Sequence, residues 1–368
     1  LNTYKHILFL ILPYSSKNIE YAQLYCGNKT LDEACPEYLR EEWNVVNKRL
    51  KAFFQSMKET NLDYSKYCMR DLVPTSFLEE YGKIKNKICL YVFKRYEKPD
   101  NYDHLLSLTK VTTEIKNKNL KINLDSLSKR MHEFKTRQFV KKIKKGPSNI
   151  AYDINGTKTG RLLTKKSFPI LTMDKTYRTI LEPNNDWFVE FDYNAAELRV
   201  LMGLLGKEQP QEDMHEWNLK NVFRGIGTRS KAKERIFAWL YNPKSKDFLA
   251  NRAYDRDSVV KKYYTQGQVP TFFTRVIKAD EHHALNYIIQ STAADLFLKQ
   301  MVKVWNILKN KKSYIAFCVH DSFVVDFAEE DIGILREIKK IFKSTDLGEF
   351  KVNIVAGKNY GDMHKLSF

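Results

Sequence analysis

The sequence contains no hydrophobic segment long enough to span a lipid bilayer. The apolar run ILFLIL covers only residues 7–12, whereas a transmembrane helix needs about 20 mostly apolar residues. Pro13 and Tyr14 follow this run without the small residues of a signal-peptide cleavage site. We therefore expect a strand at residues 7–12 and no association with a membrane.

Cysteine pairs are also missing. The chain has five cysteines, an odd number, and they are scattered along the sequence. No CxxC pair or His/Cys cluster indicates structural zinc. The five are Cys26, Cys35, Cys68, Cys89 and Cys318. Because unpaired cysteines are typical of reducing compartments, we expect a cytoplasmic location.

Acidic residues are in deficit. Lys and Arg total 62 against 44 Asp and Glu, which gives a formal net charge of +18. Such an excess indicates a polyanionic partner, and nucleic acid is favoured over a membrane surface. The alternative is a solvated basic surface without a partner. With 368 residues, 43% of them hydrophobic, the chain can form two or three lobes around a sizeable core.

The chain shows no internal repeat and no low-complexity segment. Residues 1–100 have helical patterns after the first apolar run, and the PDN turn at 99–101 is a plausible boundary. Residues 103–145 continue as an amphipathic helical pattern that ends in a basic run, and residues 207–265 form a mixed helical region. We therefore expect a helical N-terminal lobe followed by a larger mixed region.

Two aspartates stand at the ends of predicted strands. In WFVEFDYNAAELRVLMGLLG, residues 187–206, a buried strand ends near Asp192 and a helix closed by Gly206 carries Glu197 in its first turn. In YIAFCVHDSFVVDF, residues 314–327, two apolar strands flank His320 and Asp321 as in a tight hairpin. Taken alone, the hairpin is best explained as a surface turn with a polar tip.

The presence of both aspartates changes that interpretation. Two carboxylates about 4 Å apart repel by about 4 kcal/mol at an effective dielectric constant near 20. A divalent cation between them removes this repulsion. Magnesium held by one or two carboxylates and by substrate phosphates is the usual arrangement in phosphoryl transfer.

A third pattern lies in TRSKAKERIFAWLYN, residues 228–242. Two cations, Arg229 and Lys233, and two aromatic residues, Phe237 and Tyr241, recur at intervals of four. They share one helix face over about 18 Å. A nucleoside triphosphate has the same layout, with phosphates at one end and a stackable base at the other. The alternative is an amphipathic helix with solvated cations and buried rings.

Together these blocks resemble family A DNA polymerases. DYNAAELR resembles the first palm motif, RSKAKERIFAWLY the fingers helix and CVHDSF the second palm motif. TGRL, DMH and NYIIQSTAADLF resemble the template-primer segment, the segment before the fingers helix and the minor-groove helix. Six ordered matches over residues 157–327 are far more specific than any one of them.

The resemblance implies an α+β right-hand fold, with an antiparallel palm sheet, helical fingers and a reduced helical thumb. It divides the chain into a small N-terminal lobe at 1–100, a thumb at 103–150, a first palm part at 151–206, fingers at 207–275 and a second palm part at 276–368. The N-terminal lobe has a degenerate or truncated exonuclease as one interpretation. YCMRD, residues 67–71, has the spacing of an exonuclease motif, but so short a pattern is better explained by chance.

The resemblance also implies roles for individual residues. Asp192 and Asp321 would hold two Mg²⁺ ions, Lys233 would take part in catalysis, and Glu197 would be the steric gate against ribonucleotides. A salt bridge from Glu197 to a nearby arginine is the simpler alternative. Nucleotide contacts are implied for Arg229, Lys233, Phe237, Tyr241, His215 and Glu197. Contacts with primer-template DNA are implied for Arg161, Asn286, Gln290, His320 and Thr159.

Three positions depart from the family pattern. Asn242 replaces the glycine after the fingers tyrosine, and since Asn tolerates the left-handed conformation, we expect the turn to survive. Ser322 replaces the usual glutamate of the second palm motif, and His282 replaces an arginine before Asn286. The short thumb predicts low processivity or a processivity or replisome protein as partner. Basic runs such as Lys141–Lys145 would compensate through phosphate contacts, although a solvated helix face explains them equally well.

The expected activity is template-directed addition of deoxynucleotides to a primer 3′-end, with release of pyrophosphate, by a monomer. One alternative is a phage-type single-subunit RNA polymerase or primase, because HDSF resembles that class, whereas Glu197 favours deoxynucleotides. Another is a non-catalytic, polymerase-derived DNA-binding scaffold, against which both aspartates argue. The composition and short thumb suggest a phage origin, which would place the enzyme in the host cytoplasm.

Overall fold

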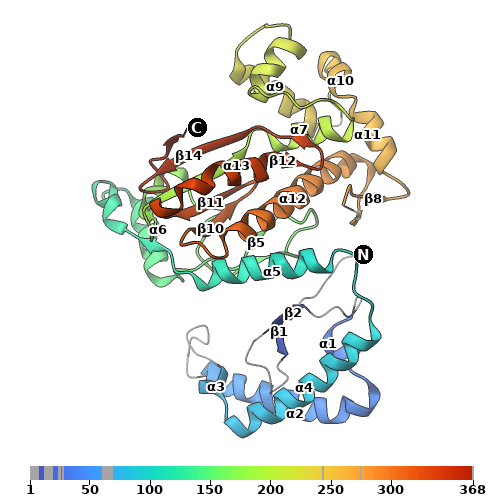
Figure 1. Cartoon of the computed structure of the whole chain (residues 1–368), viewed down its shortest axis with the longest axis vertical. Helices are drawn as coiled ribbons and strands as arrows, with labels where there is room; N and C mark the ends of the chain where they lie inside the picture. The colour runs from blue at the N-terminus through green and yellow to red at the C-terminus, as the bar shows by residue number, and fades with distance from the viewer. Residues whose placement is uncertain are drawn as a thin grey trace. The chain divides into compact units, whose positions relative to one another are not determined.

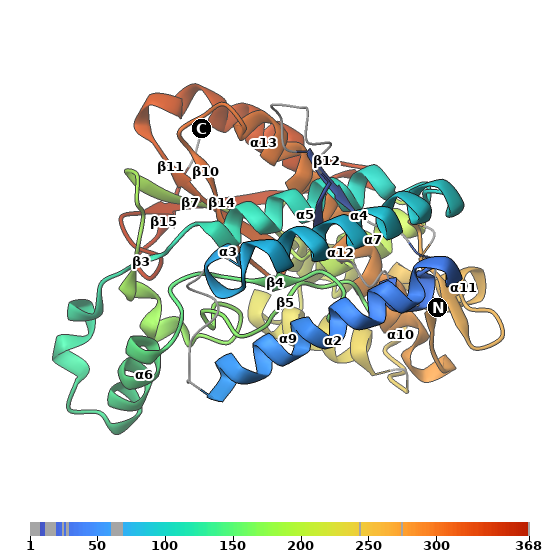
Figure 2. The same cartoon turned by 90° about the horizontal axis from the view of Figure 1, so that it is seen from below.

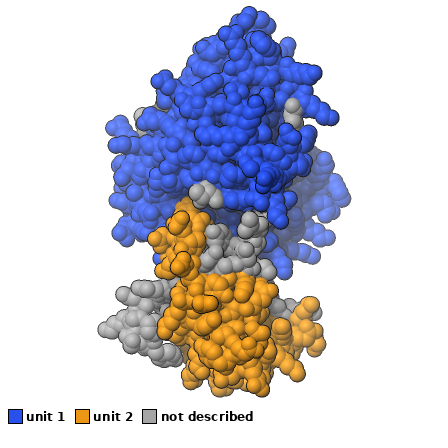
Figure 3. Space-filling model, turned by 90° about the vertical axis from the view of Figure 1, so that its right-hand side faces the viewer, with its two compact units in different colours: residues 1, 107–368 blue, residues 2–106 orange. Residues whose placement is uncertain are grey.

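A computed structural model describes residues 8–11, 20–23, 26, 29–59, 69–242, 244–273 and 275–366. The chain divides into two compact units, and each is described by itself (Figure 3). The smaller unit comprises residues 2–106 and the larger unit residues 107–368. Within the described residues, no helix combines the length and apolar character needed to cross a membrane.

The smaller unit is built on two long helices, α2 (Glu37–Glu59) and α4 (Thr75–Arg95). Its remaining elements are β1 (Leu8–Ile11), β2 (Glu20–Gln23), α1 (Leu31–Ala34) and α3 (Met69–Leu72). The core between the long helices includes Trp43, Phe77 and Ile88. The strand predicted at residues 7–12 is confirmed as β1, which pairs with β2 in antiparallel fashion. Tyr67 of the YCMRD pattern lies outside the described residues.

The larger unit is organised around a five-stranded antiparallel sheet of order β10-β11-β7-β14-β15 (Figure 1). These strands are β7 (Trp187–Tyr193), β10 (Tyr314–Val319), β11 (Ser322–Phe327), β14 (Val352–Gly357) and β15 (His364–Lys365). The predicted hairpin is thus confirmed as β10 and β11. The central strand, β7, ends one residue beyond Asp192.

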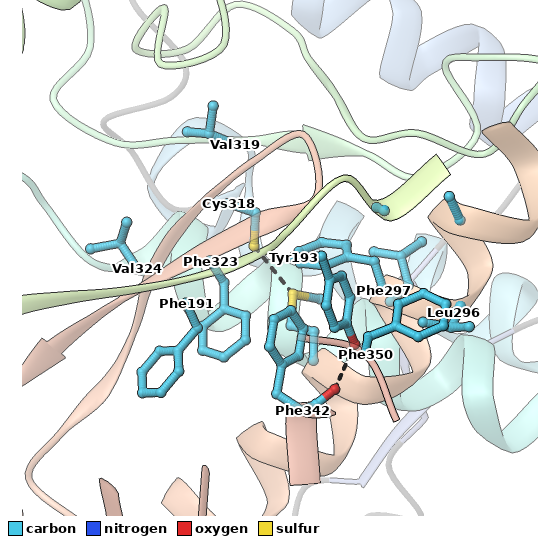
Figure 4. Packing of buried hydrophobic residues seen from close by; sticks show 14 of the residues in the cluster. Phe191, Tyr193, Leu296, Phe297, Cys318, Val319, Phe323, Val324, Phe342 and Phe350 are labelled. Atoms are coloured by element: carbon cyan, nitrogen blue, oxygen red, sulfur yellow. Dashed lines mark hydrogen bonds between the residues drawn. The ribbon is translucent and has the colours of Figure 1, made fainter. Parts of the chain in front are cut away.

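Two helices, α12 (Glu281–Leu308) and α13 (Leu335–Lys343), cover one face of this sheet (Figures 1 and 2). Since side chains alternate along a strand, Phe191 and Tyr193 point into this core while Glu190 and Asp192 lie on the opposite face. Tyr193 stacks on Phe342 of α13, with ring centroids 3.9 Å apart, and donates a hydrogen bond to its carbonyl oxygen at 2.7 Å (Figure 4). The apolar packing therefore fixes which face carries the acidic residues.

The rest of the larger unit consists of short helices and two-stranded sheets. Helices α7, α9, α10 and α11 lie together at the upper right of Figure 1. Helix α5 (Tyr102–Asn117) contains the boundary between the two units, at residues 106 and 107. The other helices are α6 (Phe134–Lys145), α7 (Ala196–Leu204), α8 (Met214–Trp217), α9 (Arg229–Tyr241), α10 (Phe248–Tyr254) and α11 (Arg256–Tyr263). The small sheets pair β3 (Lys121–Ile122) with β6 (Leu181–Glu182), β4 (Tyr152–Asp153) with β5 (Leu163–Thr164), β8 (Gln268–Pro270) with β9 (Val276–Lys278) and β12 (Ser344–Thr345) with β13 (Gly348–Glu349).

The prediction of a continuous helical pattern over residues 103–145 is wrong in its middle part. Helix α5 ends at Asn117, and β3 then pairs with β6. Asn123 caps the 3₁₀ helix at residues 124–130 by accepting a hydrogen bond from the Asp125 amide at 3.0 Å. Because the pairing partner of β3 lies about sixty residues away in the chain, local helical periodicity gave no indication of this break.

Candidate active site

Asp192 and Asp321 lie at the same edge of the central sheet. Strands β7 and β11 pair so that Asp192 is opposite Ser322, the residue that directly follows Asp321. Asp321 belongs to the two-residue turn between β10 and β11. The strand register therefore brings together two aspartates that are 129 residues apart in the chain (321 minus 192).

The electrostatic environment of these carboxylates is strongly perturbed. Burial, the charge of Asp321 and the charge of Glu190 raise the pKa of Asp192 to about 7. Burial also raises the pKa of Asp321, with Arg161 acting in the opposite direction and Glu197 in the same one. Within the part of the chain that the structure describes, no basic side chain forms an ion pair with either aspartate. Such an arrangement favours a bound cation.

Backbone strain accompanies both aspartates. His320, before Asp321, has φ +55°, and Ala195, three residues after Asp192, also has φ +55°. Residues other than glycine adopt this left-handed conformation at a cost of about 1–2 kcal/mol. Such strain is concentrated at functional sites, where the surrounding structure maintains it.

Glu197 connects two elements of the site. Its carboxylate, in the first turn of α7, accepts hydrogen bonds from the Arg161 guanidinium and from the Tyr241 hydroxyl at the end of α9. The arginine salt bridge predicted as the simpler role is therefore present. Burial and the Glu197 carboxylate raise the pKa of Tyr241, so this hydroxyl remains a hydrogen-bond donor.

The turn between β7 and α7 is held by a residue that sequence analysis did not single out. Arg199 is fully buried and donates hydrogen bonds to the carbonyl oxygens of Asn194 (2.7 Å), Pro210 (2.7 Å) and Glu212 (3.0 Å). The Asn194 amide nitrogen donates to Asp213 Oδ2 at 2.8 Å. An arginine inside the apolar helix was the signal available in the sequence. These contacts tie the carboxylate turn to the segment that precedes α8.

Asp213 anchors Arg229, one of the two cations of α9 predicted to contact phosphates. It caps α8 and accepts two hydrogen bonds from Arg229, at 2.7 and 3.0 Å. Although burial acts to raise the pKa of Asp213, hydrogen bonds from Arg229 and Asn194 outweigh it and hold this pKa well below its ordinary value. Arg229 is exposed and therefore accessible to a competing anion.

His215 lies beside this ion pair and packs against α9. Its ring contacts Phe237 edge-on at 5.5 Å, and its Nδ1 atom is buried without a hydrogen-bond partner in the described part of the chain. Burial lowers the pKa of His215 to about 4, and the charges of Arg229 and Lys233 act in the same direction. The charge of Asp213 acts to raise this pKa but does not outweigh burial, so His215 is neutral at pH 7.

The face predicted from four-residue spacing is present on α9. Arg229 begins the helix and Tyr241 ends it. The rings of Phe237 and Tyr241 are nearly parallel, with centroids 5.8 Å apart. Lys233 and Arg229 are exposed, whereas Phe237 is half-buried. Asn242 ends the helix in extended backbone, with φ −107°, so the left-handed conformation that Asn tolerates is not used here.

The residues predicted to contact DNA fall into two groups. Arg161 and His320 act electrostatically on Asp321 and so belong to its surroundings. Asn286 and Gln290 occupy successive turns of α12, and the side-chain oxygen of Asn286 is buried without a partner among the described residues. Thr159 is buried, next to Gly160. In the described part of the chain, no hydrogen bond or ion pair links Thr159, Asn286 or Gln290 to the two aspartates.

Ser322, the residue that follows the second aspartate, departs from the family pattern. Ser322 is buried and donates a hydrogen bond to Glu190 Oε1 at 2.8 Å. Glu190 lies two residues before Asp192 on the same sheet face. Burial raises the pKa of Glu190, while the Ser322 hydrogen bond and the charges of Arg178 and Lys175 act to lower it. The position of Glu190 in WFVEFDY was the signal that sequence analysis left unused.

Comparison with known proteins agrees with the resemblance. A family model described as DNA polymerase family A matches residues 259–365. DNA polymerase I of Borreliella burgdorferi is 26% identical over 234 residues, which are 49% of this chain and 26% of that protein. DNA polymerase I of Chloroflexus aurantiacus is 25% identical over 279 residues, which are 60% of this chain and 30% of that protein. The chain thus spans less than a third of the length of these two relatives.

A solved structure supports the fold. The POL domain of Pol1 from M. smegmatis, in complex with DNA primer-template and dNTP, aligns with a TM-score of 0.59 at 14% sequence identity. The alignment covers 81% of this chain and 77% of that one. The predicted α+β polymerase fold is confirmed. The predicted resemblance of this chain to DNA polymerase family A is likewise confirmed.

Proposed function

We propose that the chain is a template-directed DNA polymerase that adds deoxynucleotides to a primer 3′-end and releases pyrophosphate. The observation that carries this proposal is that Asp192 and Asp321 lie at the same sheet edge without a cationic partner in the described residues. The relatives named DNA polymerase I and the family match support the same activity.

The aspartates fit a centre for divalent cations that is completed by substrate. No group of three or more His, Cys, Asp or Glu side chains among the described residues is placed to hold a metal alone. Asp192 and Asp321 would therefore hold two Mg²⁺ ions together with substrate phosphates. Bound there, such ions lower the pKa of the primer hydroxyl and neutralise the triphosphate and leaving pyrophosphate.

Helix α9 would bind the triphosphate along its exposed face. Arg229 exchanges Asp213 for phosphate oxygens, Lys233 contributes a second charge, and both stabilise the charge that develops on pyrophosphate. The neutral His215 donates a hydrogen bond to a phosphate oxygen but contributes no positive charge. Phe237 packs on the sugar and base, and Tyr241 lies at the templating position.

Glu197 would select the sugar. Its carboxylate is held by Arg161 and Tyr241, so it cannot swing away from a 2′-hydroxyl without breaking both hydrogen bonds. A side chain held in this way would crowd the 2′-hydroxyl of a ribonucleotide and so favour deoxynucleotides. Glu197 therefore has both roles, as a salt-bridge partner and as a steric gate.

Primer-template DNA would lie across Thr159, Arg161, Asn286 and Gln290, with His320 at the primer terminus. Minor-groove acceptors are present in every correct base pair, which suits the amide side chains of Asn286 and Gln290. The exposed lysines of α6 at 141, 142, 144 and 145 would add phosphate contacts and salt dependence. The solved POL domain was bound to DNA primer-template and dNTP, which supports these substrates.

The same proposal assigns residues 103–150 to a thumb, 151–206 and 276–368 to a palm, 207–275 to fingers and 1–100 to an N-terminal lobe. A monomer assisted by a processivity or replisome protein is part of this proposal, because the thumb segment is short.

Primer extension tests the proposal. The full chain, with Mg²⁺ and a short primed template, should add the deoxynucleotide complementary to each of four template bases. Extension with ribonucleotides at comparable efficiency would instead identify an RNA polymerase or primase. DNA binding without extension by any nucleotide would identify a non-catalytic scaffold.

A further inference from the structure

The face of the sheet that carries Asp192 also carries Glu190, to which neither sequence analysis nor the proposed mechanism gives a role. Residues 190 and 192 are two apart on β7, so both side chains project from the same face. The register pairs Asp192 with Ser322 and Glu190 with Val324. Ser322 therefore lies next to both carboxylates.

A hydrogen bond joins the two strands at this point. Ser322 Oγ lies 2.8 Å from Glu190 Oε1 and 3.0 Å from the Val319 carbonyl oxygen. A hydroxyl has one proton to donate, and a carboxylate is the stronger acceptor. The short side chain of Ser322, which is buried, leaves room for Glu190 on this face. A glutamate at position 322 would add a carboxylate on the same face as Glu190.

This sheet edge therefore has as many acidic groups as the family pattern, but one of them lies on a different strand. A family A palm usually has glutamate at the position of Ser322, and here the acid lies on the neighbouring strand. In the described residues, no basic side chain donates a hydrogen bond or forms an ion pair to Glu190. The charges of Arg178 and Lys175 act to lower the pKa of Glu190, and the charge of Glu190 acts in turn to raise the pKa of Asp192.

We propose that Glu190 is the third acidic residue of this centre, a positioning residue that acts electrostatically on Asp192 from the same face of β7. This inference rests on the proposed function. Glu190 is assigned this role rather than that of a direct ligand because its carboxylate accepts a hydrogen bond from Ser322. Neighbouring groups that orient or polarise the ligands of a metal typically change metal affinity about 10- to 100-fold.

The test is a titration of the full chain with Mn²⁺, followed by electron paramagnetic resonance, on a dideoxy-terminated primer-template. Glu190→Gln keeps the volume and an acceptor for Ser322, and should weaken Mn²⁺ binding about 10- to 100-fold. Glu190→Ser combined with Ser322→Glu returns the acid to the neighbouring strand and should recover affinity to within about threefold. Glu349→Gln, which removes an exposed carboxylate of β13, is the matched control and should bind as wild type.

The outcomes separate this inference from the proposed function. Wild-type Mn²⁺ affinity in Glu190→Gln would overturn the role of Glu190. If Asp192→Asn nevertheless abolished Mn²⁺ binding, the proposed polymerase centre would stand. Failure of the double variant to recover, with thermal unfolding unchanged, would also overturn it. Absence of Mn²⁺ binding in the wild type would overturn both proposals. The half-saturating Mg²⁺ concentration in primer extension should rise in Glu190→Gln and fall back in the double variant.

Discussion

Replacement of Glu197 by alanine separates its two roles. The carboxylate is 11% exposed and is bonded to Arg161, whose side chain is 38% exposed, and to Tyr241, which is 48% exposed. Water reaches both donors once the carboxylate is gone, so neither is left buried and unpaired. We therefore expect Glu197→Ala to lower the free energy of unfolding by only about 1–2 kcal/mol.

The effect on sugar selection should be larger than the effect on stability. Forcing an additional atom into a filled site costs about 1–3 kcal/mol. Removing that crowding should lower discrimination against ribonucleotides by about 5- to 150-fold, since about 1.4 kcal/mol corresponds to tenfold. The assay is single-nucleotide incorporation, with kcat/KM measured for matched deoxy- and ribonucleotides.

Two further variants act as controls for this prediction. Glu197→Gln keeps the volume of the side chain and should keep most of the discrimination. Tyr241→Phe removes the hydroxyl bonded to Glu197 but leaves the carboxylate, and should also discriminate. Full sugar selectivity in Glu197→Ala would refute the gate and leave only the salt-bridge role.

Three other predictions concern the framework of the site. Arg199→Met leaves the carbonyl oxygens of Asn194, Pro210 and Glu212 without their donor and should reduce stability in urea by about 3–5 kcal/mol. Lys312→Met, which breaks an exposed ion pair with Glu330, should cost at most about 1 kcal/mol, and equal losses would contradict the account. The lowered pKa of Asp213 contributes stability that is present above about pH 4 and is lost as the pH falls through the folded pKa. The destabilisation caused by Asp213→Asn in urea should therefore shrink from pH 7 towards about pH 3, and a constant difference would count against it. Gly160 has φ +77° and the Arg275 guanidinium occupies the place of a β-carbon, so Gly160→Ala should cost at least about 1–2 kcal/mol in thermal unfolding, whereas Gly82→Ala, with open space around it, should not destabilise.

The elements that sequence patterns predicted well are those with strong local signals. The aromatic and apolar run WFVEFDY and the two apolar runs around His320 and Asp321 predicted β7, β10 and β11, and four-residue spacing predicted α9. Gly206 closes α7 with φ +68°, as its place after an apolar helix indicated. Local chemistry determines each of these features.

The features that sequence patterns missed depend on partners far along the chain. The pairing of β3 with β6 interrupts a helical pattern that is locally continuous. The contacts of Arg199 run to Pro210 and Glu212, and the Ser322–Glu190 hydrogen bond joins residues 132 positions apart. A single sequence gives no distance between such residues, so Glu190 was visible as an acid in a strand but not as a neighbour of Asp321.

The most direct test of the central claim measures binding and chemistry in the same samples. Primer-template affinity by fluorescence anisotropy and single-nucleotide incorporation by rapid quench should be compared for wild type, Asp192→Asn and Asp321→Asn. The account predicts that all three bind the duplex within a few-fold of one another and that only the wild type extends the primer at an appreciable rate. Extension by either variant at the wild-type rate, or no extension by the wild type, would contradict the assignment of these aspartates to the catalytic centre.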